Sequence, residues 1–413
     1  MPEIKAFKGW RPKASHAKAI ASVPYDVISS KEARELAQGN PHSFLHVIKP
    51  EIDLPLDHDP YGKAVYDTGK SNFENLISEG LIFRDNEPSI YLYQLQMGEH
   101  IQTGILALAA IEDYFSGKIK IHELTRPVKE EDRKTHVRVG KMHAEPVFFA
   151  YPSHPPLESY IASLLEETPM YGFQAEDGIF HRMWRIHDSV AIDFIITEFD
   201  KVPASYVADG HHRTAAAALV GKEMKENNPN HTGEEGYNYF MAVHFPDTQL
   251  YIMDYNRVVK DLNGLSPEEF LQRLSPNFEV QEVSDAVRPE KLHELGMYLK
   301  GTWYKLTAKA HTYDPDDPIK VLDVSVLSRF ILEPLFQIID LRRDKRIDFV
   351  GGMRGLQELE KRVDSGEMEV AFSMYPVSMG QLIDIADAGM LMPPKTTWFE
   401  PKLRSGLVVN TFD

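Results

Sequence analysis

The chain has 413 residues, 43% of them hydrophobic and 26% charged, no cysteine, and a net charge of −17 at neutral pH. This acidity argues against a nucleic-acid partner held by bulk electrostatics. The missing cysteine excludes disulfides, thiolate metal sites and cysteine nucleophiles. The length predicts two or three domains. No run approaches the ~18 apolar residues of a membrane span, and the N-terminus lacks the apolar run of a secretory signal. We therefore expect a soluble cytoplasmic protein without a membrane partner.

The first part of the chain predicts two helices and a β-hairpin. The expected elements are helices over 31–36 and 61–80 and strands over 89–97 and 101–111. Ser29 or Ser30 can cap the first of these helices. Ahead of it lies a Pro-Tyr-Asp loop, which is either a plain turn or a functional loop. Tyr25 and Asp26 in this loop are therefore candidates for a binding site.

An apolar strand after the hairpin ends directly in His122-Glu123. A carboxylate beside a cationic site is a natural general base, and a surface His-Glu pair is the plainer alternative. A charged helix follows as far as Met142. Its Lys129 and Arg133 belong either to a solvated face or to an anion site. The elements expected next are strands over 145–151, 179–187 and 190–196, a helix over 155–167, and a hairpin from 239–245 and 249–253.

The most distinctive stretch is Asp209-Gly210-His211-His212-Arg213, between a β-prone segment and an alanine-rich helix. Glycine permits a tight turn and a close backbone approach. The start of the helix supplies N–H groups and the positive end of its dipole. Cations are unfavourable at that end, so a bound anion, with phosphate the leading candidate, would offset them. The alternative is that Asp209 only caps the helix and the histidines are polar surface.

The chain changes character near residue 265, where Ser266-Pro267 is a good helix start. We predict one domain over 1–265 and an α/β domain over 266–413. The elements expected in the second domain are strands over 277–283, 302–307 and 370–375, and helices from 267, from 323, over 355–365 and over 379–388. The tail places cations, hydroxyls and aromatics between prolines, which predicts a positioned loop that returns to the site. Its candidate residues are Lys395, Thr396 and Lys402.

Several familiar motifs are absent. The chain has no G-x-x-x-x-G-K-[ST] phosphate loop, no G-x-G-x-x-G after a strand and no H-E-x-x-H zinc motif. Adjacent residues on a helix face different ways, so His211 and His212 could not both bind one zinc ion without a non-helical turn. A magnesium ion held mainly by a phosphorylated substrate stays open.

In this order, several of these motifs resemble the domain of unknown function 1015 family. They are Pro24-Tyr25-Asp26-Val27-Ile28, His122-Glu123 with Asp132-Arg133, Asp209 to Arg213, Asp323-Val324-Ser325-Val326-Leu327, and Pro393 through Lys402. The resemblance extends over the whole chain. It implies an α+β fold, with a ParB/sulfiredoxin-like mixed-sheet core, an N-terminal extension and a C-terminal α/β unit. The family more often has Lys-Ser-Thr where Lys395-Thr396-Thr397 stands here, a change that keeps the hydroxyl.

The same signature occurs in free L-serine kinases of this superfamily, which form O-phosphoserine. The resemblance implies that Gly210, His211, His212 and Arg213 bind donor phosphates. It also implies that Asp209 orients the serine hydroxyl or a metal and that Glu123 is the general base. The resemblance further implies that substrate or donor is bound by Tyr25, Asp26, His122, Thr125, Lys129, Arg133, Lys395, Thr396 and Lys402. The expected cofactor is Mg²⁺, held mainly by donor phosphates and by Asp209, and the donor is ADP, ATP or pyrophosphate.

Other functions of the superfamily fit this sequence less well. Sulfiredoxin chemistry needs a cysteine, and a ParB-like protein acting on DNA should be basic. The main alternative to a kinase is a regulatory module that binds a nucleotide, pyrophosphate or a phosphorylated metabolite without turnover. The sequence leaves the exact acceptor and the oligomeric state open.

Overall fold

The computed structural model describes residues 1–412, and the chain forms two compact units. Unit 1 contains residues 1–120, 125–250 and 401–412, and unit 2 contains residues 121–124 and 251–400. The predicted boundary after residue 265 therefore lies too late in the chain. The physical reason is that β14 (Tyr255–Val259) pairs with β18 (Ile347–Gly351) and β19 (Val370–Ser373) in unit 2.

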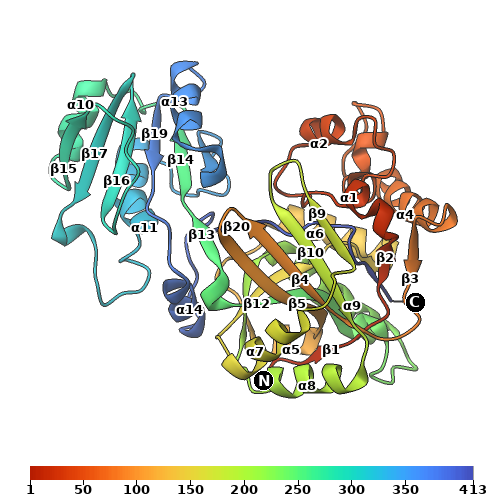
Figure 1. Ribbon diagram of the computed structural model, residues 1–413. Helices are drawn as coiled ribbons and strands as arrows, with labels where there is room; N and C mark the ends of the chain where they lie inside the picture. Colours follow the sequence, from red (N-terminus) through yellow and green to blue (C-terminus); the bar gives the residue numbers. More distant parts are fainter. Residues whose placement is uncertain (413) are drawn as a thin grey trace. The chain divides into compact units, whose positions relative to one another are not determined.

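Unit 1 is built on a nine-stranded mixed sheet (Figure 1). Its strands lie in the order β6 (Ile119–Lys120), β11 (Ser205–Asp209), β8 (Val147–Tyr151), β12 (Tyr239–Pro246), β5 (His100–Ala110), β4 (Ile90–Met97), β10 (Phe180–Ile186) and β9 (Tyr171–Gln174), with β1 (Ile4–Lys5) also beside β5. The pairs β11–β6 and β12–β8 are parallel and the others are antiparallel. This mixed sheet confirms the expected α+β class.

Helices and two small ribbons complete unit 1. The helices are α1 (Ala17–Ile20), α2 (Ser30–Ala37), α3 (Leu45–Ile48), α4 (Lys63–Ser78), α5 (Ile111–Phe115), α6 (Pro127–Gly140), α7 (Pro155–Leu164), α8 (Ser189–Phe199) and α9 (His211–Asn227). The ribbons pair β2 (Trp10–Pro12) with β3 (Ile82–Arg84), and β7 (Met142–His143) with β21 (Asn410–Thr411). Side chains of α7 and α8 form one core with β4, β5 and β10. Helix α9 packs on β8, β11 and β12, and α6 packs on α9.

The sequence explains why α9 lies close to its sheet. Four consecutive alanines, Ala215 to Ala218, are buried on it, and their small side chains allow a close approach of helix and sheet. At Gly221 a Cβ would lie only 2.3 Å from the carbonyl oxygen of Tyr237, so the helix cannot carry a side chain there without moving. This packing fixes the position at which α9 begins.

Unit 2 contains a six-stranded antiparallel sheet. The strand order is β15 (Phe278–Val283), β17 (Thr302–Ala308), β16 (Glu294–Leu299), β19, β14 and β18. Its other elements are β13 (Tyr251–Met253), α10 (Pro267–Leu274), α11 (Asp323–Leu327), a π-helical segment (Ser328–Leu332), α12 (Glu333–Phe336), α13 (Leu356–Asp364), α14 (Met379–Asp387) and β20 (Trp398–Glu400). Side chains of α13 pack on β14, β16 and β18. Figure 1 shows α13 beside β14 and β19.

Two element predictions are wrong and several strands are missed. Residues 190–196 form part of α8 and not a strand, because the Asp188 side chain accepts a hydrogen bond from Ala191 N and caps a helix there. The strands around Pro246 form no hairpin, since β12 pairs with β5 and β8 while β13 pairs with β20. The missed strands include β9 in unit 1 and β14, β16 and β18 in unit 2. None of the helices within residues 1–412 is long and apolar enough to cross a membrane.

Candidate phosphate site at the start of helix α9

The motif found in the sequence forms the turn between β11 and α9. The ladder between β11 and β8 shifts register between Val207 and Asp209, and such an irregularity redirects the side chains that follow it. Gly210 has a φ of 93°, a left-handed conformation that a glycine adopts without strain. The Asp209 side chain accepts a hydrogen bond of 2.8 Å from Gly210 N. The turn thus holds the carboxylate against the first residues of the helix.

The carboxylate of Asp209 is bound by a lysine from the other end of the chain. Lys402 Nζ donates to Asp209 Oδ2 at 2.9 Å, and Arg213 Nη2 lies 4.0 Å from the same oxygen. Burial would raise the pKa of Asp209, but the charges of Lys402, Arg213 and His211 outweigh it and hold the pKa well below its ordinary value. Asp209 is therefore an ionised acceptor and a weak base.

The guanidinium of Arg213 is turned into unit 1, with only 8% of the residue exposed. Its Nη1 donates to the carbonyl oxygen of Pro146, and its Nη2 lies 3.9 Å from Asp26 Oδ2. Burial would lower the pKa of Arg213, but Asp26, Glu145 and Asp209 raise it above its ordinary value. These contacts favour a role for Arg213 in holding the carboxylates in place.

Glu145 is a central residue of this cluster that the sequence analysis did not select. Its Oε1 accepts hydrogen bonds from Tyr25 N and Ser405 Oγ, both at 3.1 Å, and its Oε2 lies 3.8 Å from Arg133 Nη1. Burial raises the pKa of Glu145, against the lowering effect of Arg213 and Arg133. A charged residue one position ahead of Pro146 and the apolar run 147–151 is the signal that could have identified it.

Arg133 and Tyr25 lie in the same cluster. The Arg133 guanidinium lies over the Tyr25 ring, 4.0 Å from its centroid, and Arg133 Nη2 donates to Asp132 Oδ2 at 2.9 Å. Burial raises the pKa of Tyr25 far above its ordinary value, so this hydroxyl stays neutral. The charges of Arg133 and Arg213 both act on Glu145, and the three residues form part of a buried ionic network.

The starts of two helices meet at the turn. The backbone N–H of Arg126, the N-cap of α6, donates to His212 Nε2 at 2.9 Å. The accepting nitrogen carries no proton, so this bond fixes His212 as the Nδ1–H tautomer when the ring is neutral. One residue earlier, the Thr125 hydroxyl donates to Glu130 within the first turn of α6. The positive ends of α6 and α9 are therefore neighbours.

The remaining candidates lie elsewhere. Lys129 is exposed, with its amine 6.0 Å from the centroid of the Tyr61 ring. Four candidates belong to unit 2: His122, Glu123, Lys395 and Thr396. There His122 Nε2 lies 3.2 Å from Thr397 Oγ1, and the Lys395 amine lies 5.8 Å from the centroid of the Tyr255 ring. The structure therefore gathers Tyr25, Asp26, Arg133, Lys402 and Asp209 to Arg213 in unit 1.

Carboxylate oxygens are the ligands that Mg²⁺ prefers, and Asp209 and Asp26 supply them near the turn. Within residues 1–412, no group of three or more histidine, aspartate or glutamate side chains is arranged to hold a metal ion. The donor set of this turn thus suits a metal that a phosphorylated ligand brings with it better than a resident metal.

Comparisons with solved structures give distant similarities. A conserved hypothetical protein from Pyrococcus furiosus is 15% identical, with 74% of this chain and 95% of that chain covered and a TM-score of 0.34. A free serine kinase in complex with AMP is 14% identical, with 74% of this chain and 91% of that chain covered and a TM-score of 0.35. A C-terminally truncated SbnI from Staphylococcus aureus is 13% identical, with 71% of this chain and 82% of that chain covered and a TM-score of 0.37. No curated protein matches the chain.

The sequence also matches the family described as "Protein of unknown function (DUF1015)" over residues 4–325. The match contains the motifs from Tyr25 to Arg213 and ends within the Asp323 segment, so the tail motif around Lys395 lies beyond it. This confirms the family resemblance over most of the chain but not over its tail. With well over half of its residues matched, the chain belongs to the DUF1015 family.

Proposed function

We propose that this protein is a small-molecule kinase that transfers a phosphoryl group to the hydroxyl of free L-serine or a similar small alcohol. The observation that carries the proposal is the meeting of the starts of α6 and α9 beside Asp209 and Lys402. Phosphoryl transfer needs mainly positioning and positive potential around the phosphate oxygens. The geometry of unit 1 offers both.

The two helix starts are the main phosphate ligands in this proposal. The first N–H groups of an α-helix have no partner within the helix, and the dipole adds positive potential there. Gly210 lets a phosphate approach the backbone closely, because it carries no side chain. His211 adds a donor beside the turn, whereas Arg213 and Arg133 keep the surrounding carboxylates in place.

Asp209 orients the acceptor hydroxyl or the metal. Its lowered pKa makes it a poor proton acceptor at neutral pH, although its oxygens remain good hydrogen-bond acceptors. Lys402 holds this carboxylate in the free protein and can turn to a donor phosphate when substrates bind. Mg²⁺, held mainly by the donor phosphates, would neutralise their charge. Asp209 and Asp26 are the residues that could complete its ligands.

The general base in the proposal is Glu123, as the family resemblance implies. The serine oxygen attacks the terminal phosphorus, the bond from phosphorus to the bridging oxygen breaks, and the leaving group keeps the electron pair. The hydroxyl proton passes to the Glu123 carboxylate. The donor is a nucleotide or pyrophosphate, with ADP, ATP and pyrophosphate as the candidates.

Product formation tests the proposal directly. The full-length protein is incubated with Mg²⁺, L-serine and either ADP, ATP or pyrophosphate, and O-phosphoserine is measured by phosphorus NMR or mass spectrometry. We expect product with at least one donor, and none when the His211→Ala variant replaces the wild type. Donors that raise Tm but give no product with any small alcohol would contradict the kinase and support a binding module.

Replacing Glu123 by glutamine tests the base. Loss of a general base should lower kcat by about 10²–10⁴-fold and leave KM for serine nearly unchanged. The matched control is Glu99→Gln in the turn between β4 and β5, which should behave as the wild type. Near-normal turnover by Glu123→Gln would show that another group takes the proton.

A second candidate is a regulatory module that binds a nucleotide, pyrophosphate or phosphorylated metabolite without turnover. The observation that favours it is the Lys402–Asp209 ion pair, which occupies the carboxylate that a kinase would use. In a binding module this pair would stay closed when the ligand binds. The product assay separates the two, since only a kinase forms O-phosphoserine, whereas a binding module gives a rise in Tm with pyrophosphate or nucleotide and no product.

A further inference from the structure

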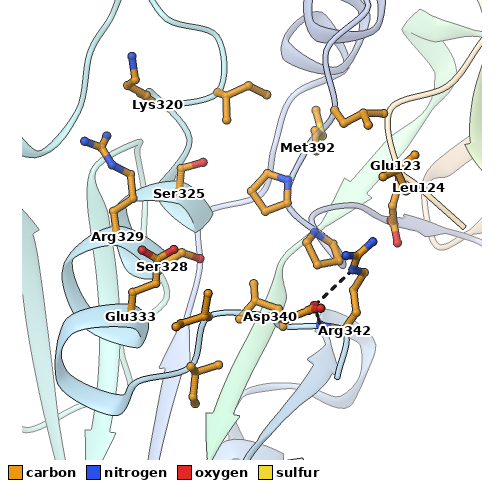
Figure 2. Close-up of a pocket in the computed structure, with 17 residues that line it drawn as sticks. Glu123, Leu124, Lys320, Ser325, Ser328, Arg329, Glu333, Asp340, Arg342 and Met392 are labelled. Atoms are coloured by element: carbon orange, nitrogen blue, oxygen red, sulfur yellow. Dashed lines mark hydrogen bonds and ion pairs between the residues drawn. The ribbon is translucent and has the colours of Figure 1, made fainter. Parts of the chain in front are cut away.

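Unit 2 has an open cavity of its own, of about 570 Å³, whose lining residues all belong to that unit (Figure 2). This volume lies in the range of pockets that bind small organic molecules. Much of the wall is apolar and comes from Ile338, Leu341, Met392 and Pro393 among others. Polar groups enter from the helical stretch that begins at Asp323. The cavity thus combines an apolar wall with a polar side.

The polar side contains a buried hydroxyl that lacks a partner. Ser325 is only 5% exposed, and its Oγ has no hydrogen-bond partner within residues 1–412. Figure 2 shows this hydroxyl turned toward the side of the cavity where Met392 lies. The helix after it loosens into the π-helical segment Ser328–Leu332, a rare conformation that is common at functional sites. An unsatisfied buried hydroxyl is costly, and a ligand in the cavity would satisfy it.

Two opposite charges at the rim are also unpaired. The lining contains three cations and three carboxylates: Lys320, Arg329, Arg342, Glu123, Glu333 and Asp340. Lys320 is bound by Asp317 at 2.6 Å, and Arg342 is paired with Asp340 at 3.3 Å. Neither Arg329 nor Glu333 has an ion-pair partner within the part of the chain that the structure describes. Both line the cavity, four residues apart on the same helical run. Figure 2 shows the Arg329 guanidinium on the side of Lys320 and the Glu333 carboxylate on the side of Ser328.

We infer that this cavity binds a zwitterion with an apolar body, that is, an α-amino acid with a large apolar side chain. The guanidinium of Arg329 can take the carboxylate through two parallel hydrogen bonds. Glu333 can take the ammonium group, and Ser325 supplies a further polar contact. The apolar side chain lies against the wall formed by Ile338 and Met392. The inference is independent of the kinase proposal, because neither binding nor its loss requires phosphoryl transfer.

Calorimetric titration of the full-length protein tests the ligand class. The probes are L-phenylalanine, N-acetyl-L-phenylalanine, L-phenylalaninamide and L-serine. We expect one binding site for L-phenylalanine and affinities at least about tenfold lower for the other three, since each lacks one charge or the apolar body. Absence of binding by L-phenylalanine, or equal binding by its N-acetyl and amide derivatives, would overturn the inference. Tighter binding of L-serine would overturn the apolar class.

Variants assign each charge to its partner. Arg329→Met should remove the preference for L-phenylalanine over its amide, and Glu333→Gln should remove the preference over the N-acetyl derivative. The control is Arg273→Met on α10, an exposed arginine of the same unit that does not line the cavity. Unchanged preferences in both rim variants would overturn the assignment.

Ser325→Ala separates a ligand-binding role from a purely structural one. Removing an unsatisfied buried hydroxyl should raise the Tm of the free protein and weaken binding of L-phenylalanine several-fold. A merely structural serine would not show these opposite effects. A higher Tm with unchanged affinity would remove Ser325 from the site. Both readouts also remain interpretable if the protein shows no kinase activity.

Discussion

The charge of a single carboxylate decides what the turn of unit 1 can do. Asp209 is kept ionised by Lys402 and Arg213, so it can orient a hydroxyl but cannot easily take its proton. A kinase at this turn therefore needs its base on another residue. Lys402 is the partner whose loss should change the pKa of Asp209 most, because its ion pair with Asp209 is shorter than that of Arg213.

Lys402→Met should lower the free energy of unfolding at pH 7 by about 1–2 kcal/mol, since Asp209 loses a partner but remains partly exposed. A lowered pKa stabilises the fold above the ordinary pKa of aspartate, and this contribution disappears as Asp209 becomes protonated on acidification. The difference between variant and wild type should therefore shrink below about pH 4. Urea unfolding measures it.

Lys225→Met, in the exposed last turn of α9, is the control and should change the free energy of unfolding by less than about 0.5 kcal/mol. Equal unfolding free energies for the wild type and Lys402→Met would show that the ion pair with Asp209 contributes nothing to the fold.

At the scale of one element, α9 can begin where it does only because Gly210 precedes it. A Cβ on this residue would lie 3.1 Å from Cζ and Nε of Arg213, and the φ of 93° disfavours any other residue. The same glycine therefore shapes the turn and keeps room for the guanidinium that organises the buried carboxylates. A substitution here tests both effects together.

Gly210→Ala should destabilise the protein by about 1 kcal/mol from backbone strain, with a further loss from the displaced arginine. Gly178→Ala in the turn between β9 and β10 isolates the first effect, because Gly178 has a φ of 83° and open space around its missing Cβ. Urea unfolding should give the larger loss for Gly210→Ala. Equal losses would mean that Arg213 adapts without cost.

Elements with local signals were predictable from the sequence. The capping box of Ser29 and Glu32 starts α2, and the alanine-rich run after Gly210 forms α9, both as expected. Helix α8 was not predictable in this way. Its apolar β-branched run resembles a buried strand, and only the cap at Asp188 distinguishes the helix from a strand. The wrong hairpin around Pro246 has another cause, since β12 finds its partners far away in sequence.

At the scale of the whole molecule, unit 1 encloses four buried histidines that burial keeps uncharged. Burial lowers the pKa of His136 to about 4, and that of His143, His181 and His244 to about 3. The charge of Arg133 also lowers the pKa of His136, and the charge of Arg404 also lowers the pKa of His181. In unit 2, by contrast, burial raises the pKa of Asp323 to about 7.

Acid should therefore weaken unit 1. The unfolded chain binds protons at these histidines near pH 6.5, whereas the folded chain does so only near pH 3–4. Each histidine then costs up to about 1.4 kcal/mol of stability per pH unit within that window. Asp323 acts in the opposite direction between its ordinary pKa and about 7, but it is one group in the other unit.

Thermal unfolding measured from pH 7 to pH 4 checks this expectation. The Tm should fall with pH, and His181→Gln should flatten the fall, because glutamine does not titrate and can still bond the Tyr93 hydroxyl. Replacing the exposed His187 by glutamine is the control and should leave the slope unchanged. A Tm that is constant over this range would contradict the account of the buried histidines.

Long-range contacts set the limit of what the sequence could predict about the site. The motif at Asp209 was visible because all its residues are neighbours in the chain. Its partner Lys402 lies 193 residues away, and only the unusual tail composition pointed to it. Glu145 links Tyr25, Arg133 and Ser405 from three segments of the chain, and its only local mark is its charge ahead of the apolar run 147–151.

The most direct measurement is the position of a donor phosphate in a crystal of the protein grown with Mg²⁺ and ADP or pyrophosphate. The account predicts phosphate oxygens within hydrogen-bond distance of the first N–H groups of α9, next to Gly210, with Lys402 turned toward them. A phosphate bound elsewhere, with the start of α9 empty and Lys402 still on Asp209, would contradict it.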